Sequence, residues 1–228
     1  MKSNLSFIIP NALIISYPKA GRTWVRMLLA KYAEINKMDL SKEMVASGHW
    51  SVAEALNRHD LTKKKIIYLS RDPRDIVVSL YFEWTHRKKK FKGTLSQFIA
   101  NYFEEPIHHY NQWSRTQVKI FHEIRYEDLH SKTNLMLKLL ILVLGMDYRK
   151  DVIKRIIEEC SFDKMREIEK QGGGLLADYK GHFGKHFKSD DPESFRVRKG
   201  KVGGYVDYMT PEDIEYCNER MKTLCINK

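Results

Sequence analysis

The chain has 228 residues, enough for one domain with a real core, and 43% of them are hydrophobic, which excludes a disordered or fibrous protein. Lysine and arginine number 40 against 29 acidic residues, so the charge of +11 favours either an anionic partner or a solubilising surface. The three cysteines form no C-x-x-C pair, so we expect a reducing compartment and neither a disulfide framework nor a zinc site.

The N-terminal region combines Lys2 with an apolar run over residues 5–15, as a signal peptide would. However, Pro10 and Asn11 interrupt this run, and no small-residue cleavage site follows it. The second long apolar stretch, residues 135–144, is too short to span a bilayer. We therefore predict a cytoplasmic protein without a membrane span.

Residues 12–15 form a short apolar run of strand length, and the loop from Pro18 to Gly21 breaks it. Apolar residues at helical spacing then predict a helix over about 22–35. The first amides of such a helix lack intrahelical partners and can bind a phosphate.

The loop itself carries the charges and the hydroxyl that an anion site needs. Lys19 and Arg22 are cationic, Thr23 adds a donor, and Gly21 lets the backbone come close. The loop is not a Walker A motif, because Lys19 precedes the only glycine instead of following a second one. Taken alone, these residues fit a phosphate site and an ordinary strand–helix joint about equally well.

A second strand–helix turn follows the apolar run 66–69 and again carries a basic residue, Arg71. Asp72 is a good helix cap and Pro73 suits the first helical position, so we predict a helix that ends near 87–90. An arginine at a strand end is also often a plain surface charge, and the local pattern leaves both readings open.

The remaining elements alternate in a way that predicts an α/β fold. The sequence predicts a three-layer α/β/α arrangement with a central parallel sheet and a ligand at the carboxyl ends of the strands. The expected elements are a short helix capped by Ser51, helical structure within 91–113, a strand over 118–126, helices over 131–144 and 150–160, a helix capped by Ser161, and a last helix over 211–224.

The C-terminal third contains a glycine-rich stretch at 171–174 and a basic, glycine-rich segment at 195–205. We predict that residues 170–195 form a mobile loop or lid within a single domain of residues 1–228, because too little chain follows for a second core. The segment 195–205 can wrap an anion with backbone amides and basic side chains.

Three of these segments resemble the PAPS-dependent sulfotransferases. The stretch from Tyr17 to Trp24 resembles their 5′-phosphosulfate loop, Y-P-K-S-G-T-T-W, with Ala20 and Arg22 as departures. The stretch 71–79 is similar to their 3′-phosphate motif, R-[ND]-P-[KR]-D-x-x-V-S, and 198–205 resembles their signature R-K-G-x-x-G-D-W. Residues 126–129 also match the family's Y-E-D-L, whose tyrosine lies by the adenine.

The resemblance implies a P-loop-NTPase-like sulfotransferase fold and transfer of a sulfuryl group from PAPS to a hydroxyl or amine, with release of PAP and no metal. It also implies a set of donor-binding residues in this sequence. They are Lys19, Ala20, Gly21, Arg22, Thr23, Trp24, Arg71, Ser79, Tyr126, Arg198, Lys199 and Gly200.

The catalytic residues follow from what sulfuryl transfer requires. A cation must stabilise charge on the departing phosphate, and Lys19 is placed to do so. A base must take the acceptor's proton, and the resemblance favours His49, which precedes the 3′-phosphate motif as the family's catalytic histidine does. His59 and Glu83 are the alternatives.

Two other classes of protein fit parts of the sequence. A P-loop kinase or NTPase would use a similar loop, but the Walker lysine is missing. A nucleic-acid-binding module would explain the charge, but no recognised binding motif is present. The acceptor, a small molecule or a glycan, and the oligomeric state do not follow from the sequence.

Overall fold

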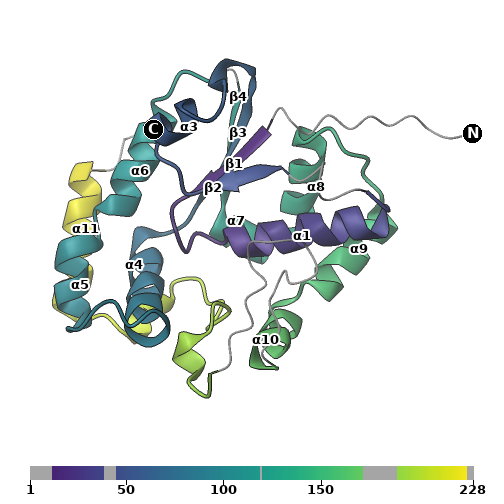
Figure 1. The fold of residues 1–228 in the computed structure, drawn as a ribbon. Helices are drawn as coiled ribbons and strands as arrows, with labels where there is room; N and C mark the ends of the chain where they lie inside the picture. Colours follow the sequence, from purple (N-terminus) through teal and green to yellow (C-terminus); the bar gives the residue numbers. More distant parts are fainter. Residues whose placement is uncertain (1–11, 39–44, 119, 172–188, 225–228) are drawn as a thin grey trace, which may run out of the picture.

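A computed structural model describes residues 12–38, 45–118, 120–171 and 189–224. At its centre lies a four-stranded parallel sheet with the strand order β2-β1-β3-β4 (Figure 1). Its strands are β1 (Ala12–Ser16), β2 (Ala46–Gly48), β3 (Lys65–Ser70) and β4 (Ile120–Arg125). Because the chain passes from β1 to β2 on one side and to β3 on the other, the order reverses at β1, where ligands bind in such sheets.

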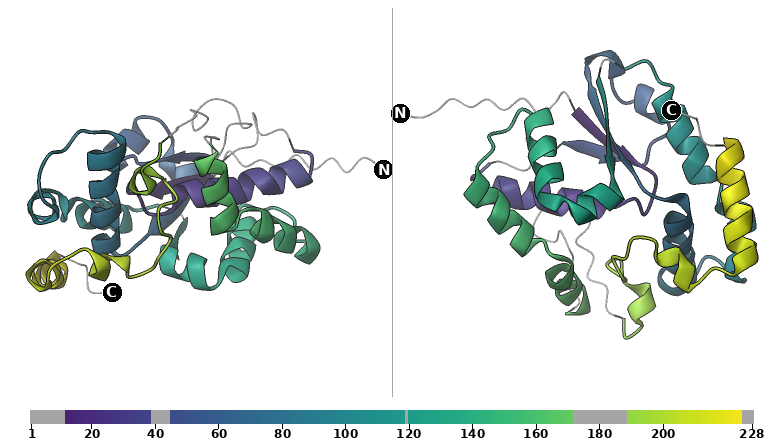
Figure 2. Two further views of the ribbon diagram at one scale, coloured as in Figure 1. Left: turned by 90° about the horizontal axis from the view of Figure 1, so that it is seen from below. Right: turned by 180° about the vertical axis from the view of Figure 1, so that it is seen from behind.

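Helices cover both faces of the sheet, as Figure 2 shows, so the predicted α/β architecture is confirmed. They are α1 (Arg22–Ile35), α3 (Val52–Leu56), α4 (Pro73–Phe82), α5 (Leu95–Tyr102), α6 (Glu105–Ser114), α7 (Tyr126–Ser131), α8 (Thr133–Val143), α9 (Lys150–Glu159), α10 (Phe162–Lys170) and α11 (Pro211–Leu224). A π-helical turn, Glu83–Arg87, extends α4, and short 3₁₀ turns occur at Leu61–Lys63, Pro192–Ser194 and Gly204–Asp207.

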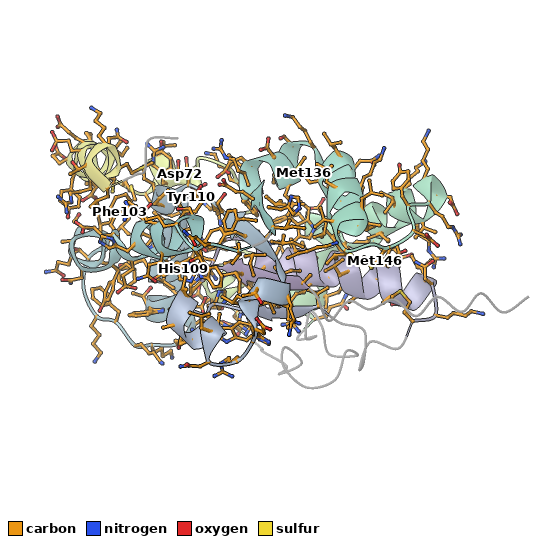
Figure 3. The ribbon with its side chains drawn as sticks, turned by 90° about the horizontal axis from the view of Figure 1, so that it is seen from above. Asp72, Phe103, His109, Tyr110, Met136 and Met146 are labelled. Atoms are coloured by element: carbon orange, nitrogen blue, oxygen red, sulfur yellow. The ribbon has the colours of Figure 1, made fainter. Side chains whose placement is uncertain are left out.

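The two central strands, β1 and β3, are apolar on both faces because both faces are buried. Ile14 of β1 packs with α1, α8 and α9, whereas its neighbours Leu13 and Ile15 pack with α3 and α6 on the other side. Figure 3 shows these two sides, with Met136 and Met146 on one and His109 and Tyr110 on the other. A third apolar cluster joins α4, α5, α6 and α11 and anchors α4 beside the sheet.

The predicted caps are confirmed in some places and wrong in others. The Asp72 carboxylate accepts the backbone N–H of Arg74 at 2.9 Å, and Ser51 caps α3 in a reciprocal capping box with Glu54. Ser131 does not start α8; its hydroxyl donates to the carbonyl of Glu127 inside α7. Ser161 precedes α10 but makes no side-chain cap bond. Because the Ser131 hydroxyl bonds within α7, it cannot accept a hydrogen bond from the first backbone N–H groups of α8.

The sequence analysis missed strand β2 and helix α7. Residues 46–48 are too short and too polar for a strand pattern, yet they pair with Leu13, Ile14 and Ile15 of β1. The predicted lid at 170–195 lies mostly outside the described residues, which resume at 189 with the turn Pro192–Ser194.

Two buried carboxylates hold the C-terminal segment 195–205, here called the strap, against the rest of the molecule. Asp75 of α4, 3% exposed, accepts the backbone N–H groups of Gly203 and Tyr205 at 2.9 and 3.0 Å. Glu169 of α10, also 3% exposed, accepts those of Arg196 and Val197, both at 2.9 Å. The strap is thereby tied to helices that lie far from it in the sequence.

We expect Asp75→Ala to lower the free energy of unfolding by about 3 kcal/mol, since it leaves buried N–H groups unpaired and removes a partner of Arg71. Urea denaturation followed by circular dichroism measures this loss. The matched control is Asp191→Ala, which removes a carboxylate that pairs with His86 and caps the turn Pro192–Ser194, and it should cost about 1 kcal/mol. Equal losses in the two variants would contradict the clamping role of Asp75.

Candidate active site

A cavity of about 580 Å³ opens at the carboxyl edge of the sheet. Each of the four strands contributes a lining residue that directly follows it: Tyr17, His49, Arg71 and Tyr126. Parallel strands end at one edge, so residues from distant parts of the chain meet there. The N-terminus of α1, the inner side of α4, the strap and residues of α7 to α10 line the rest of the cavity.

Most residues that the sequence singled out lie around this one cavity. Its lining includes Lys19, Gly21, Arg22, Thr23, Trp24, His49, Arg71, Ser79, Glu83, Tyr126, Arg198, Lys199 and Gly200. Ala20 is 2% exposed and packs behind the loop, and His59 is not among the lining residues.

The loop between β1 and α1 presents backbone amides to the cavity. Gly21 caps α1 with φ of 97°, a left-handed conformation that favours glycine. A Cβ atom at Gly21 would lie 2.7 Å from the Tyr126 ring, so only glycine allows this close approach. The amides of Arg22 and Thr23, in the first turn of α1, have no intrahelical acceptor and can bind an anion.

Lys19 adopts a left-handed backbone conformation, φ 72°, which is uncommon for a residue with a side chain. Its carbonyl accepts a hydrogen bond from Arg71 at 3.2 Å, which holds the loop in this shape. Backbone strain of this kind concentrates at functional sites.

Arg71 connects three parts of the site. Besides Lys19, its guanidinium donates to the carbonyl of Lys201 in the strap at 3.3 Å and pairs with Asp75 at 3.4 Å. It lies over the Tyr126 ring, 4.3 Å from the centroid. Its Nε is buried without a hydrogen-bond partner among the described residues.

The strap brings further cations to the cavity wall. The Arg198 guanidinium stacks on Phe82 at 4.2 Å and is bonded to Glu193 and to the Tyr208 hydroxyl. Gly200 has φ of 61°, and a Cβ there would lie 2.4 Å from the Phe162 ring. Glycine is therefore required where the strap crosses α10.

His49 reaches the cavity because β2 pairs with β1. Its Nδ1 lies 2.8 Å from the carbonyl oxygen of Ser16, so Nδ1–H donates and Nε2 is left unprotonated. Burial of the imidazole and the nearby charge of Arg22 lower the pKa of His49 to about 4. The imidazole is therefore neutral at physiological pH and able to accept a proton.

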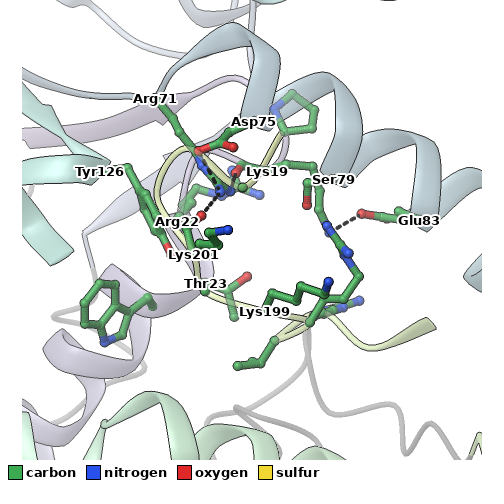
Figure 4. A pocket seen from close by; sticks show the side chains of 18 of the residues that line it. Lys19, Arg22, Thr23, Arg71, Asp75, Ser79, Glu83, Tyr126, Lys199 and Lys201 are labelled. Carbon is green, nitrogen blue, oxygen red and sulfur yellow. Dashed lines mark hydrogen bonds and ion pairs between the residues drawn. The ribbon is translucent and has the colours of Figure 1, made fainter. Parts of the chain in front are cut away.

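Lys19 and Glu83 form an ion pair of 2.9 Å across the cavity, and Figure 4 shows the lysine side chain extended toward the carboxylate. Glu83 also pairs with Lys88 at 2.6 Å. Burial raises the pKa of Glu83, but Lys19 and Lys88 outweigh it and hold this pKa at about 2. Burial lowers the pKa of Lys19, and the pairing with Glu83 opposes that shift.

The sequence analysis did not name several of the lining residues as site residues. Trp84 and Lys88 come from the segment after α4, whereas Arg196 precedes the matched signature in the strap and Lys201 lies at a variable position within it. The two strap residues belong to the basic segment 195–205 that the sequence analysis predicted to bind an anion, although neither was named as a site residue. Trp84 and Lys88 could not have been predicted, because their direction depends on the π-helical geometry of the turn.

No group of three His, Cys, Asp or Glu side chains close enough to hold a metal occurs within the described ranges. In the same part of the chain, no helix is both long and apolar enough to cross a membrane.

A parallel sheet with helices on both faces and an anion-binding type of loop at its carboxyl edge is the architecture of nucleotide-binding α/β proteins. The family model for the sulfotransferase domain matches residues 10–226, and the chain therefore belongs to the sulfotransferase family, as the motifs predicted.

Related proteins support this assignment. The chain is 23% identical to cytosolic sulfotransferase 17 of Arabidopsis thaliana, over 89% of this chain and 71% of that protein. It is 26% identical to human sulfotransferase 2A1, over 73% of this chain and 70% of that protein.

Solved structures of similar fold include mouse sulfotransferase SULT7A1 complexed with PAP, with a TM-score of 0.72 and 19% identity over 93% of this chain and 82% of that one. A second is retinol dehydratase in complex with androsterone and PAP, with a TM-score of 0.69 and 16% identity over 94% and 80%. The predicted sulfotransferase fold is thereby confirmed.

Proposed function

We propose that this protein transfers the sulfuryl group of PAPS to a hydroxyl or amine acceptor and releases PAP. The observation that carries this proposal is the convergence of the loop 17–24, Arg71 and the strap on one cavity. Such a cavity can hold one ligand with two separate phosphate groups. Two proteins of similar fold, mouse sulfotransferase SULT7A1 and retinol dehydratase, have PAP in their structures.

In this proposal the donor lies across the carboxyl ends of β1 and β3. The amides at the start of α1 bind its 5′-phosphosulfate, together with Lys19, Arg22 and Thr23. Arg71 and Ser79 bind its 3′-phosphate, and the strap residues Arg198, Lys199 and Gly200 complete that side. Trp24 and Tyr126 flank the adenine, in keeping with their edge-to-face contact at 6.2 Å.

The reaction requires a proton acceptor on one side of the sulfur and a cation on the other. Nε2 of His49 takes the acceptor's proton as its oxygen or nitrogen bonds to sulfur. The bond between sulfur and the bridging oxygen breaks, and the electron pair stays on the 5′-phosphate, where Lys19 stabilises the added charge. No further reactant is needed.

In this proposal the acceptor is a small molecule or a glycan. Besides the residues assigned to the donor, the cavity lining includes Tyr17, Leu80 and Trp84 together with the charged Glu83 and Lys88. We also propose a cytoplasmic location and a single catalytic domain, supported by relatives named cytosolic sulfotransferases.

Calorimetric titration with PAP and with ADP, without added metal, tests the function. We expect PAP to bind at least about 100-fold more tightly than ADP, because only PAP can engage Arg71 and the strap with a 3′-phosphate. Equal affinity for the two nucleotides, or binding that requires Mg²⁺, would contradict the proposal and favour a kinase.

A further inference from the structure

Glu83 is a carboxylate in a cavity whose charged side chains are otherwise mostly basic. Among the described residues, the acidic side chains that line the cavity are Asp75 and Glu83. Asp75 is bound to strap amides and has a structural role. Glu83 instead pairs with Lys19, the residue that the proposed reaction needs for the departing phosphate.

The ammonium group of Lys19 is therefore already engaged. Both partners are well shielded, with 13% of the Lys19 side chain and 16% of the Glu83 side chain exposed, so the pair is stronger than one on the surface. When the 5′-phosphosulfate of a donor enters the loop, Lys19 is already paired with Glu83. The carboxylate of Glu83 is negatively charged, as the phosphosulfate is, so the two anions compete for the lysine. One of the two anions must give up the lysine or share it.

Two features of the structure favour an exchange. The backbone of Lys19 is held by Arg71, so the side chain can turn while the loop keeps its shape. Glu83 also retains Lys88, 2.6 Å away, so its charge stays compensated after Lys19 leaves. A buried carboxylate that lost its only cation would carry a large penalty, and Lys88 avoids this.

We propose that Glu83 is the resting partner of Lys19 and that the anionic donor displaces it when it binds. This inference rests on the proposed function. Glu83 is then a positioning residue that keeps Lys19 charged and extended toward the cavity in the free enzyme. The free energy needed to break the pair opposes donor binding.

A double-mutant cycle with PAP as the ligand tests the exchange. We expect Glu83→Gln to tighten PAP binding by about tenfold, equivalent to about 1.4 kcal/mol that no longer has to be spent on breaking the pair. In a Lys19→Met background the same substitution should change the affinity by less than about threefold, because no pair remains to be broken. The matched control is Glu105→Gln, a carboxylate that bonds Tyr17 and does not contact Lys19.

An equal gain from Glu83→Gln in both backgrounds would show a general charge effect and overturn the inference, as would no gain at all. A crystal structure with PAP bound decides the matter even if the Lys19→Met protein binds too weakly to titrate. We expect Nζ of Lys19 to have left Glu83 there, and a pair still at 2.9 Å would overturn the exchange. Failure of wild-type protein to prefer PAP over ADP would instead count against the proposed function.

Discussion

Arg71→Ala should weaken PAP binding by about 100-fold or more, while ADP binding changes little. The expected loss corresponds to about 3 kcal/mol, the worth of charge-assisted hydrogen bonds to a phosphate in a partly buried site. The side chain is 12% exposed, and its Nε has no partner among the described residues. ADP lacks the 3′-phosphate, so the ratio of the two affinities isolates this contact.

Arg74→Ala is the matched control for Arg71→Ala. Arg74 lies on the same turn but bonds Asp72 and Asn218 and does not line the cavity. We expect it to change PAP affinity by less than about threefold. Because Arg71 also braces the loop and the strap, circular dichroism must show that the variant is folded, and Arg71→Lys, which keeps the charge, should give an intermediate loss. A uniform loss for PAP and ADP would contradict a 3′-phosphate contact.

His49→Asn should lower kcat by about 10²- to 10⁴-fold and leave PAP affinity nearly unchanged, because it removes a general base and no donor contact. Asparagine can still donate to the carbonyl of Ser16, so the local structure is retained. Steady-state kinetics with any acceptor found by screening with labelled PAPS measures the effect. His59→Asn is the control, since His59 does not line the cavity, and its kcat should stay at the wild-type level.

The pH dependence of kcat/KM checks the same assignment. The pKa of His49 is lowered to about 4, so the base is lost only as the pH falls through that value. We expect an acidic limb near pH 4 in the wild-type protein and its absence in His49→Asn. Arg22→Thr removes a charge that lowers this pKa, so the limb should move to higher pH. A limb that persists in His49→Asn would mean that another residue is the base.

Much of the fold followed from local patterns. The apolar runs at 12–15 and 66–69 and the helical spacing after each predicted two strand–loop–helix units, and the structure has β1–α1 and β3–α4 there. Asp72 and Pro73 predicted the start of α4 because capping depends on neighbours in the chain. These are features that a few consecutive residues determine.

Other elements could not be predicted from local patterns. Strand β2 has three residues without an apolar pattern and exists because β1 offers it an edge to pair with. The sequence analysis placed the start of a helix at Ser131, but this residue ends α7 and α8 begins at Thr133, since the hydroxyl of Ser131 bonds back into α7. For β2, contacts outside the local stretch outweighed local preference, whereas at Ser131 a bond to a residue four positions earlier did so.

The sequence by itself determined which segments can bind phosphate groups, since loop glycines, helix starts and basic residues act through nearby backbone. The tertiary structure decided how these segments meet and which partners their side chains have. Only the β2–β1 pairing gives His49 its bond to Ser16, and only the turn after α4 brings Glu83 to Lys19. The partners are 33 and 64 residues apart, and pairing over such separations depends on packing of the whole sheet, which no short pattern records.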